Sequence, residues 1–104
     1  MKPIDIFKAL SNETQLNILQ WLKEPEKHFP KQAAHLPKEV SYKGSVCVGD
    51  IQEKAKTSQS TVSHYLNMIQ QAGLLESVRF GKWTYYRRNE ETIRTLAEYF
   101  RTEI

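Results

Sequence analysis

Apolar residues at helical spacing predict two helices in the first quarter of the chain. Pro3 fits the first turn of a helix over residues 3–10, in which Ile4, Phe7 and Leu10 lie three positions apart. Ser11 and Asn12 interrupt this pattern, and either can cap a second helix that ends near Lys23. That second helix should lie in the core, because apolar side chains cover most of its turns: Leu16, Ile18, Leu19, Trp21 and Leu22.

The helical pattern stops in residues 24–45, which are expected to form a long loop. Pro25, Pro30 and Pro37 punctuate this mixed-charge stretch. A loop of this length without regular structure is uncommon inside a compact domain, so it is either functional or partly disordered. A single helical turn over residues 33–36 is compatible with the local composition.

Regular structure returns in residues 46–72 as a short β-prone segment and a helix-turn-helix. Residues 46–48 are β-prone, and helices are predicted over 51–55 and 58–72. Because the turn at 56–58 is so short, the two helices form a helix-turn-helix unit. The residues that can cap or end these helices are Gly49 or Asp50, Ser58 and Gly73.

Two β-prone segments around a Gly-Lys turn predict a hairpin, which a last helix follows. Residues 75–79 and 83–88 are rich in Val, Phe, Trp, Thr and Tyr, and Gly81-Lys82 suits a two-residue turn. Asn89 can cap the last helix, whose apolar stripe is Ile93, Leu96, Ala97 and Phe100. The predicted fold is mainly α with a β-hairpin (α+β), in the order α-α-(long loop)-α-α-β-β-α, within one domain of residues 1–104.

Composition and charge narrow the class of protein. No apolar run approaches the ~20 residues that cross a bilayer, and the N-terminus lacks the layout of a secretion signal, so a cytoplasmic protein is expected. The formal net charge is +3, yet residues 54–89 carry six basic side chains against one acid, or +5, and the rest sums to −2. A polyanion such as nucleic acid is the natural partner for this region, and a solvated basic surface without a partner is the alternative.

The helix over 58–72 has one apolar and one polar face. Val62, Tyr65, Leu66 and Ile69 recur at spacings of three and four, which places them on the inner face. The outer face is uncharged and rich in hydrogen-bonding groups that can contact base edges in the major groove: Gln59, Ser60, Ser63, His64 and Asn67. An ordinary solvated helix face is the alternative, although such faces usually carry Glu and Lys.

The predicted hairpin suits contact with a phosphate backbone. Its tip carries Arg79 and Lys82 beside the turn, and such cations contribute affinity without sequence preference. Trp83, Tyr85 and Tyr86 could stack on single-stranded bases, but hairpin aromatics more often pack against a core.

Four segments together resemble the ArsR/SmtB family of winged-helix repressors: residues 7–19, 58–66, 72–75 and 81–87. The resemblance implies a winged helix-turn-helix protein that binds double-stranded operator DNA as a homodimer and is released by a signal. It implies a subunit contact through the first and last helices, at Ile4, Phe7, Ile93, Leu96 and Phe100. The DNA-binding residues expected from the helix face, turn and hairpin are Lys56, Ser58, Gln59, Ser60, Thr61, Ser63, His64, Asn67, Arg79 and Lys82.

The signal is not evident from the sequence. Metal-responsive members of this family often carry a Cys-x-Cys pair where this chain has Cys47 and then Gly49. Cys47 with His28 or His35 is a conceivable metal site, and redox sensing by Cys47 is another possibility, but a lone buried thiol is the simplest interpretation. No cofactor is expected, and a small-molecule inducer stays open.

Three departures from the family pattern concern Gln15, the Lys56-Thr57 pair and the loop at 24–45. Gln15 stands where the family usually has Arg, and Lys56-Thr57 replaces a usual Gly-apolar pair. The long loop is either a tolerated insertion or a sensing element.

Two other classes of function fit the sequence less well than a repressor. A winged-helix module that binds protein or single-stranded nucleic acid is the alternative. An enzyme is not expected, because adjacent Ser63 and His64 point in different directions on a helix and the chain has no Gly-rich phosphate loop.

Overall fold

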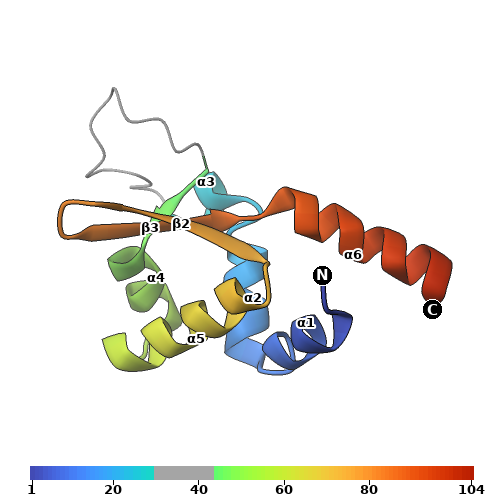
Figure 1. The fold of residues 1–104 in the computed structure, drawn as a ribbon. Coiled ribbons are helices and arrows are strands. Elements are labelled where there is room, and N and C mark those ends of the chain that lie inside the picture. The colour runs from blue at the N-terminus through green and yellow to red at the C-terminus, as the bar shows by residue number, and fades with distance from the viewer. Residues whose placement is uncertain (30–43) are drawn as a thin grey trace.

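The computed structural model describes residues 1–29 and 44–104 and contains a helix-turn-helix followed by a hairpin wing (Figure 1). The elements in chain order are α1 (Pro3–Ala9), α2 (Glu13–Trp21), α3 (Pro25–His28), β1 (Val46–Cys47), α4 (Val48–Ala55), α5 (Gln59–Gln71), β2 (Leu75–Phe80), β3 (Trp83–Arg88) and α6 (Glu90–Glu103). The predicted class, mainly α with a hairpin, is confirmed. No helix in the described part of the chain is long and apolar enough to cross a membrane.

Three helices begin at side-chain caps that the sequence predicted. The backbone N–H of Gln15 donates to Asn12 Oδ1 at 3.0 Å, that of Thr61 to Ser58 Oγ at 3.2 Å, and that of Thr92 to Asn89 Oδ1 at 3.3 Å. Each cap satisfies a backbone donor that the first helical turn leaves unpaired, and replacing such a cap with Ala typically costs about 1 kcal/mol. These caps therefore fix where α2, α5 and α6 start.

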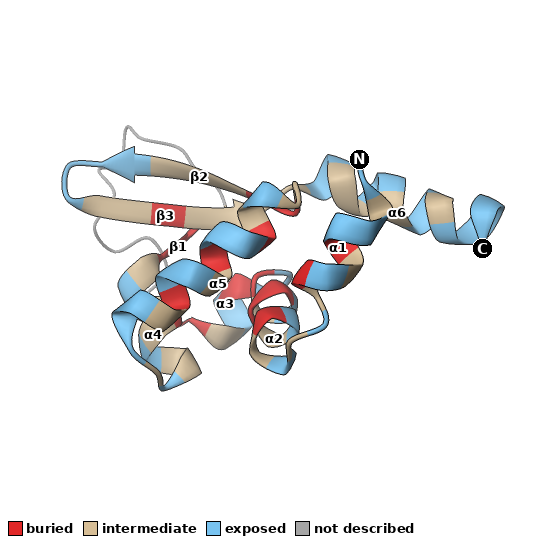
Figure 2. Ribbon diagram, turned by 60° about the horizontal axis from the view of Figure 1, so that its bottom comes forward, coloured by how far each residue is buried: buried red, intermediate tan, exposed pale blue. Residues whose placement is uncertain are grey.

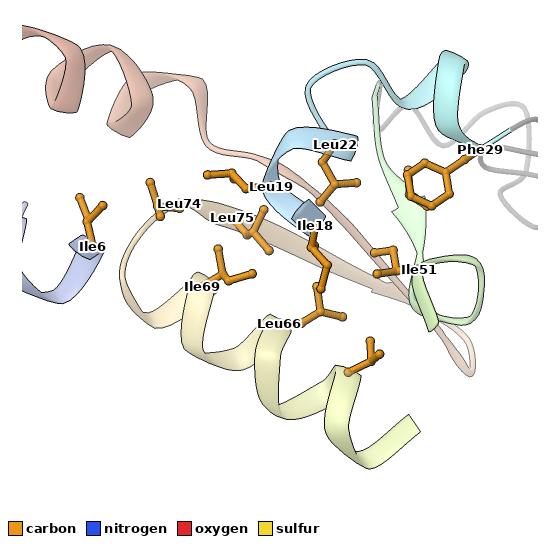
Figure 3. Close-up of a cluster of buried hydrophobic side chains, with 12 residues drawn as sticks. Ile6, Ile18, Leu19, Leu22, Phe29, Ile51, Leu66, Ile69, Leu74 and Leu75 are labelled. Carbon is orange, nitrogen blue, oxygen red and sulfur yellow. The ribbon is translucent and has the colours of Figure 1, made fainter. Parts of the chain in front are cut away.

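The core forms where α2, α4 and α5 meet the base of the hairpin (Figure 3). Leu66 and Ile69 of α5 point into this cluster together with Ile18 of α2, and all three side chains are fully buried. Burying each such side chain contributes roughly 1.5–3 kcal/mol. Because the inner face of α5 is fixed in this way, its polar face must point outward.

The three strands form an antiparallel sheet in the order β1-β3-β2. Phe80 pairs with Trp83 around the Gly81-Lys82 turn, and Gly81 has a φ of 62°, which glycine adopts without strain. Strand β1 pairs with β3 only at Tyr85 and Tyr86, so the hairpin extends beyond β1 as a projecting wing (Figure 1).

The start of the predicted loop is wrong, because residues 25–29 are structured. Helix α3 occupies Pro25–His28, and Phe29 is only 4% exposed. The Phe29 ring lies 6.5 Å from the Trp21 ring in an edge-on contact. The core therefore extends past the end of α2 to include Phe29. The helical turn predicted at residues 33–36 lies outside the described residues.

The β-prone segment is a third strand, which the predicted order lacked. Val46 and Cys47 pair with Tyr86 and Tyr85 of β3. Helix α4 begins directly afterwards at Val48 with Cys47 as N-cap, so the predicted capping by Gly49 or Asp50 is wrong. The pairing places Cys47 in extended backbone, and the helix starts where that pairing ends.

Candidate nucleic-acid interface

Helix α5 has an exposed face opposite its buried one (Figure 2). The five side chains on this face are all exposed: Gln59, Ser60, Ser63, His64 and Asn67. The opposite face buries Val62, Leu66 and Ile69, with Tyr65 half-buried beside them. The two-faced helix expected from the sequence is confirmed.

At the N-terminus of α5, two predicted contact residues bond to each other. Ser58 Oγ donates to Thr61 Oγ1 at 2.8 Å and lies 3.3 Å from Ser60 Oγ. The hydroxyls of Ser58 and Thr61 therefore serve the helix cap first. The first turn of α5 holds no acidic residue, so the positive end of the helix dipole is not neutralised there, which favours an approaching anion.

Lys56 occupies the turn between α4 and α5 in a left-handed conformation, with φ 56° and ψ 43°. This region favours glycine, and a lysine there is strained. The side chain is exposed. The turn thus places a cation close to the N-terminus of α5.

The wing tip carries two exposed cations. Arg79 Nε donates to the backbone carbonyl of Gly81 at 3.1 Å, which ties this side chain to the turn. Lys82 Nζ lies 5.2 Å from the centre of the Trp83 ring, a cation–π distance. Both groups are held at the projecting end of the hairpin.

The excess of positive charge in residues 54–89 is not spread evenly over free side chains, because several of these cations contact an acid or an aromatic ring. Arg87 lies 3.1 Å from Glu76, and Arg88 lies 3.1 Å from Glu90. Lys54 Nζ lies 5.2 Å from the Trp21 ring centre. In the described part of the chain, three cations of residues 54–89 neither form an ion pair with an acid nor pack against the core: Lys56, Arg79 and Lys82.

Burial also affects a tyrosine at the base of the wing. Tyr86 packs against the core, and its burial raises the pKa of its hydroxyl above the ordinary value of 10.0. The group is therefore neutral at neutral pH and adds no negative charge to the wing.

The comparisons with known proteins identify the family. Residues 39–77 match the model of the arsR family of bacterial regulatory proteins. The HTH-type transcriptional regulator YbzH of Bacillus subtilis is 52% identical over 104 residues, covering 100% of both chains. This chain belongs to the ArsR family of transcriptional regulators.

Other relatives of this ArsR-family protein include a repressor and a solved winged helix. The transcriptional repressor SdpR of B. subtilis is 31% identical over 82% of this chain and 73% of its own length. A Mycobacterium bovis structure, described as a homodimeric winged helix-turn-helix DNA-binding domain, is 26% identical with a TM-score of 0.63. It covers 91% of this chain and 71% of that chain, so the winged helix-turn-helix fold is confirmed.

The expected subunit-contact residues of this ArsR protein lie on α1 and α6. Ile4 is 60% exposed and Phe100 is 48% exposed. The Phe7 and Phe100 rings lie 5.7 Å apart, which joins the two helices within one protomer. Ile93 and Leu96 are half-buried against the protomer's own core. These residues thus lie on two neighbouring helices, although four of them (Phe7, Ile93, Leu96 and Phe100) also make contacts within the protomer.

Of the conceivable metal ligands, the structure describes Cys47 and His28, and neither belongs to a metal-binding cluster in the described part of the chain. Cys47 is 3% exposed and His28 is half-buried, whereas His35 lies outside the described residues. Among residues 1–29 and 44–104, no three His, Cys, Asp or Glu side chains are placed to hold a metal ion.

Sequence reasoning missed two polar contacts that hold the site in place. Gln15 is buried, and its Nε2 donates to the Ala9 carbonyl at 2.6 Å, which joins α2 to α1. Gln70 Nε2 donates to Ser77 Oγ at 2.9 Å, which joins α5 to the wing. Both contacts depend on tertiary geometry, so neither leaves a periodic signal in the sequence.

Proposed function

We propose that this ArsR-family protein is a repressor that binds double-stranded operator DNA as a homodimer, with residues 1–104 as one winged-helix domain and no catalytic activity. In this proposal α5 lies in the major groove and the wing lies along the phosphate backbone. The observation that carries it is an exposed, uncharged, hydrogen-bonding face on a helix whose opposite face is anchored in the core.

The side chains of the α5 face suit base edges. Gln and Asn amides can pair with adenine, and Ser hydroxyls can bond either bases or phosphates. His64 adds a ring nitrogen in the middle of this face. Each well-placed base contact provides roughly 1–3 kcal/mol of discrimination. Short side chains also allow the backbone of α5 to approach the floor of the groove.

Cations flank this face where phosphates would lie. Lys56 stands at the N-terminal end of α5, and Arg79 and Lys82 stand at the wing tip. Such contacts are independent of sequence and weaken steeply with salt. They would supply affinity while α5 supplies specificity.

Dimerisation through α1 and α6 would place two copies of α5 on one duplex. Ile4 and Phe100 expose apolar surface on neighbouring helices, and α6 contains no buried residue in the protomer. A two-fold dimer would present its recognition helices about 34–36 Å apart, one turn of DNA. The operator would then be pseudo-palindromic.

Selection of bound duplexes from a random pool tests this function. A recurring pseudo-palindrome is expected. Ser60→Ala or His64→Ala should relax the preference at one position of each half-site, at a cost of roughly 1–3 kcal/mol on the best duplex. Arg79→Ala or Lys82→Ala should weaken binding to all duplexes by a similar factor, and should reduce the slope of log affinity against log salt by about 1. Gln20→Ala, exposed on α2, is the control and should match the wild type.

Two outcomes would contradict the proposal. If no duplex sequence is enriched and single-stranded competitor displaces the pool, the protein is an interaction module for single strands. If alanine at positions 60, 64, 79 and 82 leaves the selected motif and its affinity unchanged, the contact surface lies elsewhere.

A further inference from the structure

We propose that Gln70 and Ser77 are positioning residues that hold the wing at a fixed angle to α5, an inference that rests on the DNA-binding role proposed above. Gln70 lies near the C-terminal end of α5, and Ser77 is the third residue of β2. The Gln70 side-chain amide donates to Ser77 Oγ at 2.9 Å, and both side chains are half-buried.

The connection between α5 and β2 is short, and both the backbone carbonyl and the side chain of Gln70 form hydrogen bonds across it. The Gly73 N–H donates to the Gln70 carbonyl at 2.9 Å, and the Leu74 N–H donates to the Ile69 carbonyl at 3.2 Å. Gly73 has a φ of 87°, so the chain reverses direction there. The backbone of Gln70 closes the turn while its side chain reaches across to the strand that leaves it.

Beyond the buried Tyr85, the wing consists of two strands only. Strand β1 pairs with β3 only as far as Tyr85, so Thr84 and Trp83 of β3 have a single neighbouring strand, in which they pair with Arg79 and Phe80. Side chains alternate along a strand, which places Ser77 and Arg79 on the same face of β2. Fixing Ser77 against α5 therefore fixes the direction from which Arg79 projects.

A hydrogen bond suits this task because it is directional, whereas an apolar contact tolerates sliding. The wing cations and the α5 face must meet the same duplex at once. An error in the angle at the base of the hairpin grows toward its tip. The Gln70–Ser77 bond is thus placed where it most affects whether both surfaces engage together.

Isosteric variants separate positioning from folding. Ser77→Val removes the hydroxyl. Ser77→Thr keeps the hydroxyl in a side chain of nearly the same volume as valine. Gln70→Met removes the donor while keeping a strong helix former. Gln71→Ala is the matched control, because this neighbouring glutamine is exposed on the same helix. The full-length protein is compared in two ways: backbone NMR relaxation of residues 79–84 without DNA, and salt-dependent affinity for the selected duplex.

Ser77→Val and Gln70→Met should increase the mobility of residues 79–84 and reduce duplex affinity about threefold to tenfold, the ratio implied by one hydrogen bond. Both should also lower the salt slope toward that of the Arg79→Ala/Lys82→Ala double variant. Ser77→Thr and Gln71→Ala should match the wild type, and the Gln70→Met/Ser77→Val pair should be no worse than either single change.

The inference is overturned if Ser77→Val leaves wing mobility and the salt slope unchanged, or if Ser77→Thr behaves like Ser77→Val. Loss of thermal stability with an unchanged slope would also overturn it, because a purely structural contact gives that result. If the wild type binds no duplex, the proposed function fails, and the NMR comparison still decides whether the contact positions the wing.

Discussion

Lys56 carries the clearest local strain among the described residues. It is the only residue there other than glycine with a positive φ, at 56°, and it ends α4 just before the turn into α5. Such strain persists where the surrounding structure demands it and often marks a functional position. Here the short turn between α4 and α5 requires a left-handed residue at position 56. Because that residue is a lysine, the turn also places a cation beside α5.

Lys56→Gly should raise the free energy of unfolding by about 0.5–1 kcal/mol, because glycine adopts the left-handed region without the Cβ penalty. The same change should weaken binding to all duplexes, since a phosphate contact is lost. Urea unfolding and a salt titration of DNA binding measure the two effects. Lys56→Asn, which tolerates the left-handed region, is the control for loss of charge. A variant that is less stable and binds equally well would contradict both statements.

At the residue scale, local signals were predictable and long-range pairs were not. Asn12, Ser58 and Asn89 act as caps that their sequence positions indicated. The ion pair of Arg87 with Glu76 depends on the β2–β3 register, which places these residues opposite each other. Counting charges along the sequence could not reveal that this arginine is engaged.

At the scale of elements, α5 and the hairpin were predictable from the sequence. The apolar residues of α5 recur at helical spacing, and a glycine-containing turn separates the two strands of the hairpin. The stripe of Val62, Leu66 and Ile69 is buried as its spacing indicated. Strand β1 is only two residues long, too short for a pattern of its own, and its pairing with β3 defines it. Helix α3 is four residues long, and the sequence did not predict it because Pro25 was interpreted as part of a loop. In the structure Pro25 is the first residue of this helix.

Two glycines in adjoining elements should respond oppositely to alanine. Gly73 ends α5 with a φ of 87°, so Gly73→Ala should cost about 1–2 kcal/mol of stability. Gly49 lies within α4, and a Cβ there would meet Cys47 Sγ at an ordinary 4.0 Å, so Gly49→Ala should add about 0.5 kcal/mol. Thermal unfolding of both variants measures the difference. Equal shifts for the two would refute the left-handed turn as the end of α5.

At the scale of the whole molecule, α6 is the element that the protomer leaves incomplete. It is 14 residues long with no buried residue, and it extends away from the body (Figure 1). A helix with an apolar stripe on this outlying position requires another surface for that stripe. A second protomer, seated on α1 and α6, would supply it.

Phe100→Asp should convert the dimer to a monomer, because a buried carboxylate without a partner is costly at an apolar contact. Sedimentation velocity measures the change, and circular dichroism checks that the fold is retained. Thr95→Asp, exposed on α6 away from the stripe of Ile93, Leu96 and Phe100, is the control and should remain dimeric. A Phe100→Asp protein that sediments as a dimer would exclude this contact.

The order of most elements and the polar face of α5 followed from the sequence, whereas the angle between α5 and the wing did not. That angle depends on the turn at Gly73 and on the bond from Gln70 to Ser77, and neither contributes to hydrophobic periodicity. The two surfaces of the candidate interface were therefore predictable, but not the contacts that align α5 with the wing.

The most direct test is to place one residue of α5 on DNA. A cleavage reagent is attached to Asn67→Cys in a Cys47→Ser background and bound to the selected duplex, with Thr102→Cys on α6 as control. Position 67 should cut the duplex at two clusters about 10 base pairs apart, as two recognition helices in successive major grooves require, and position 102 should not. No cutting from position 67, or equal cutting from both positions, would contradict the proposed role of α5.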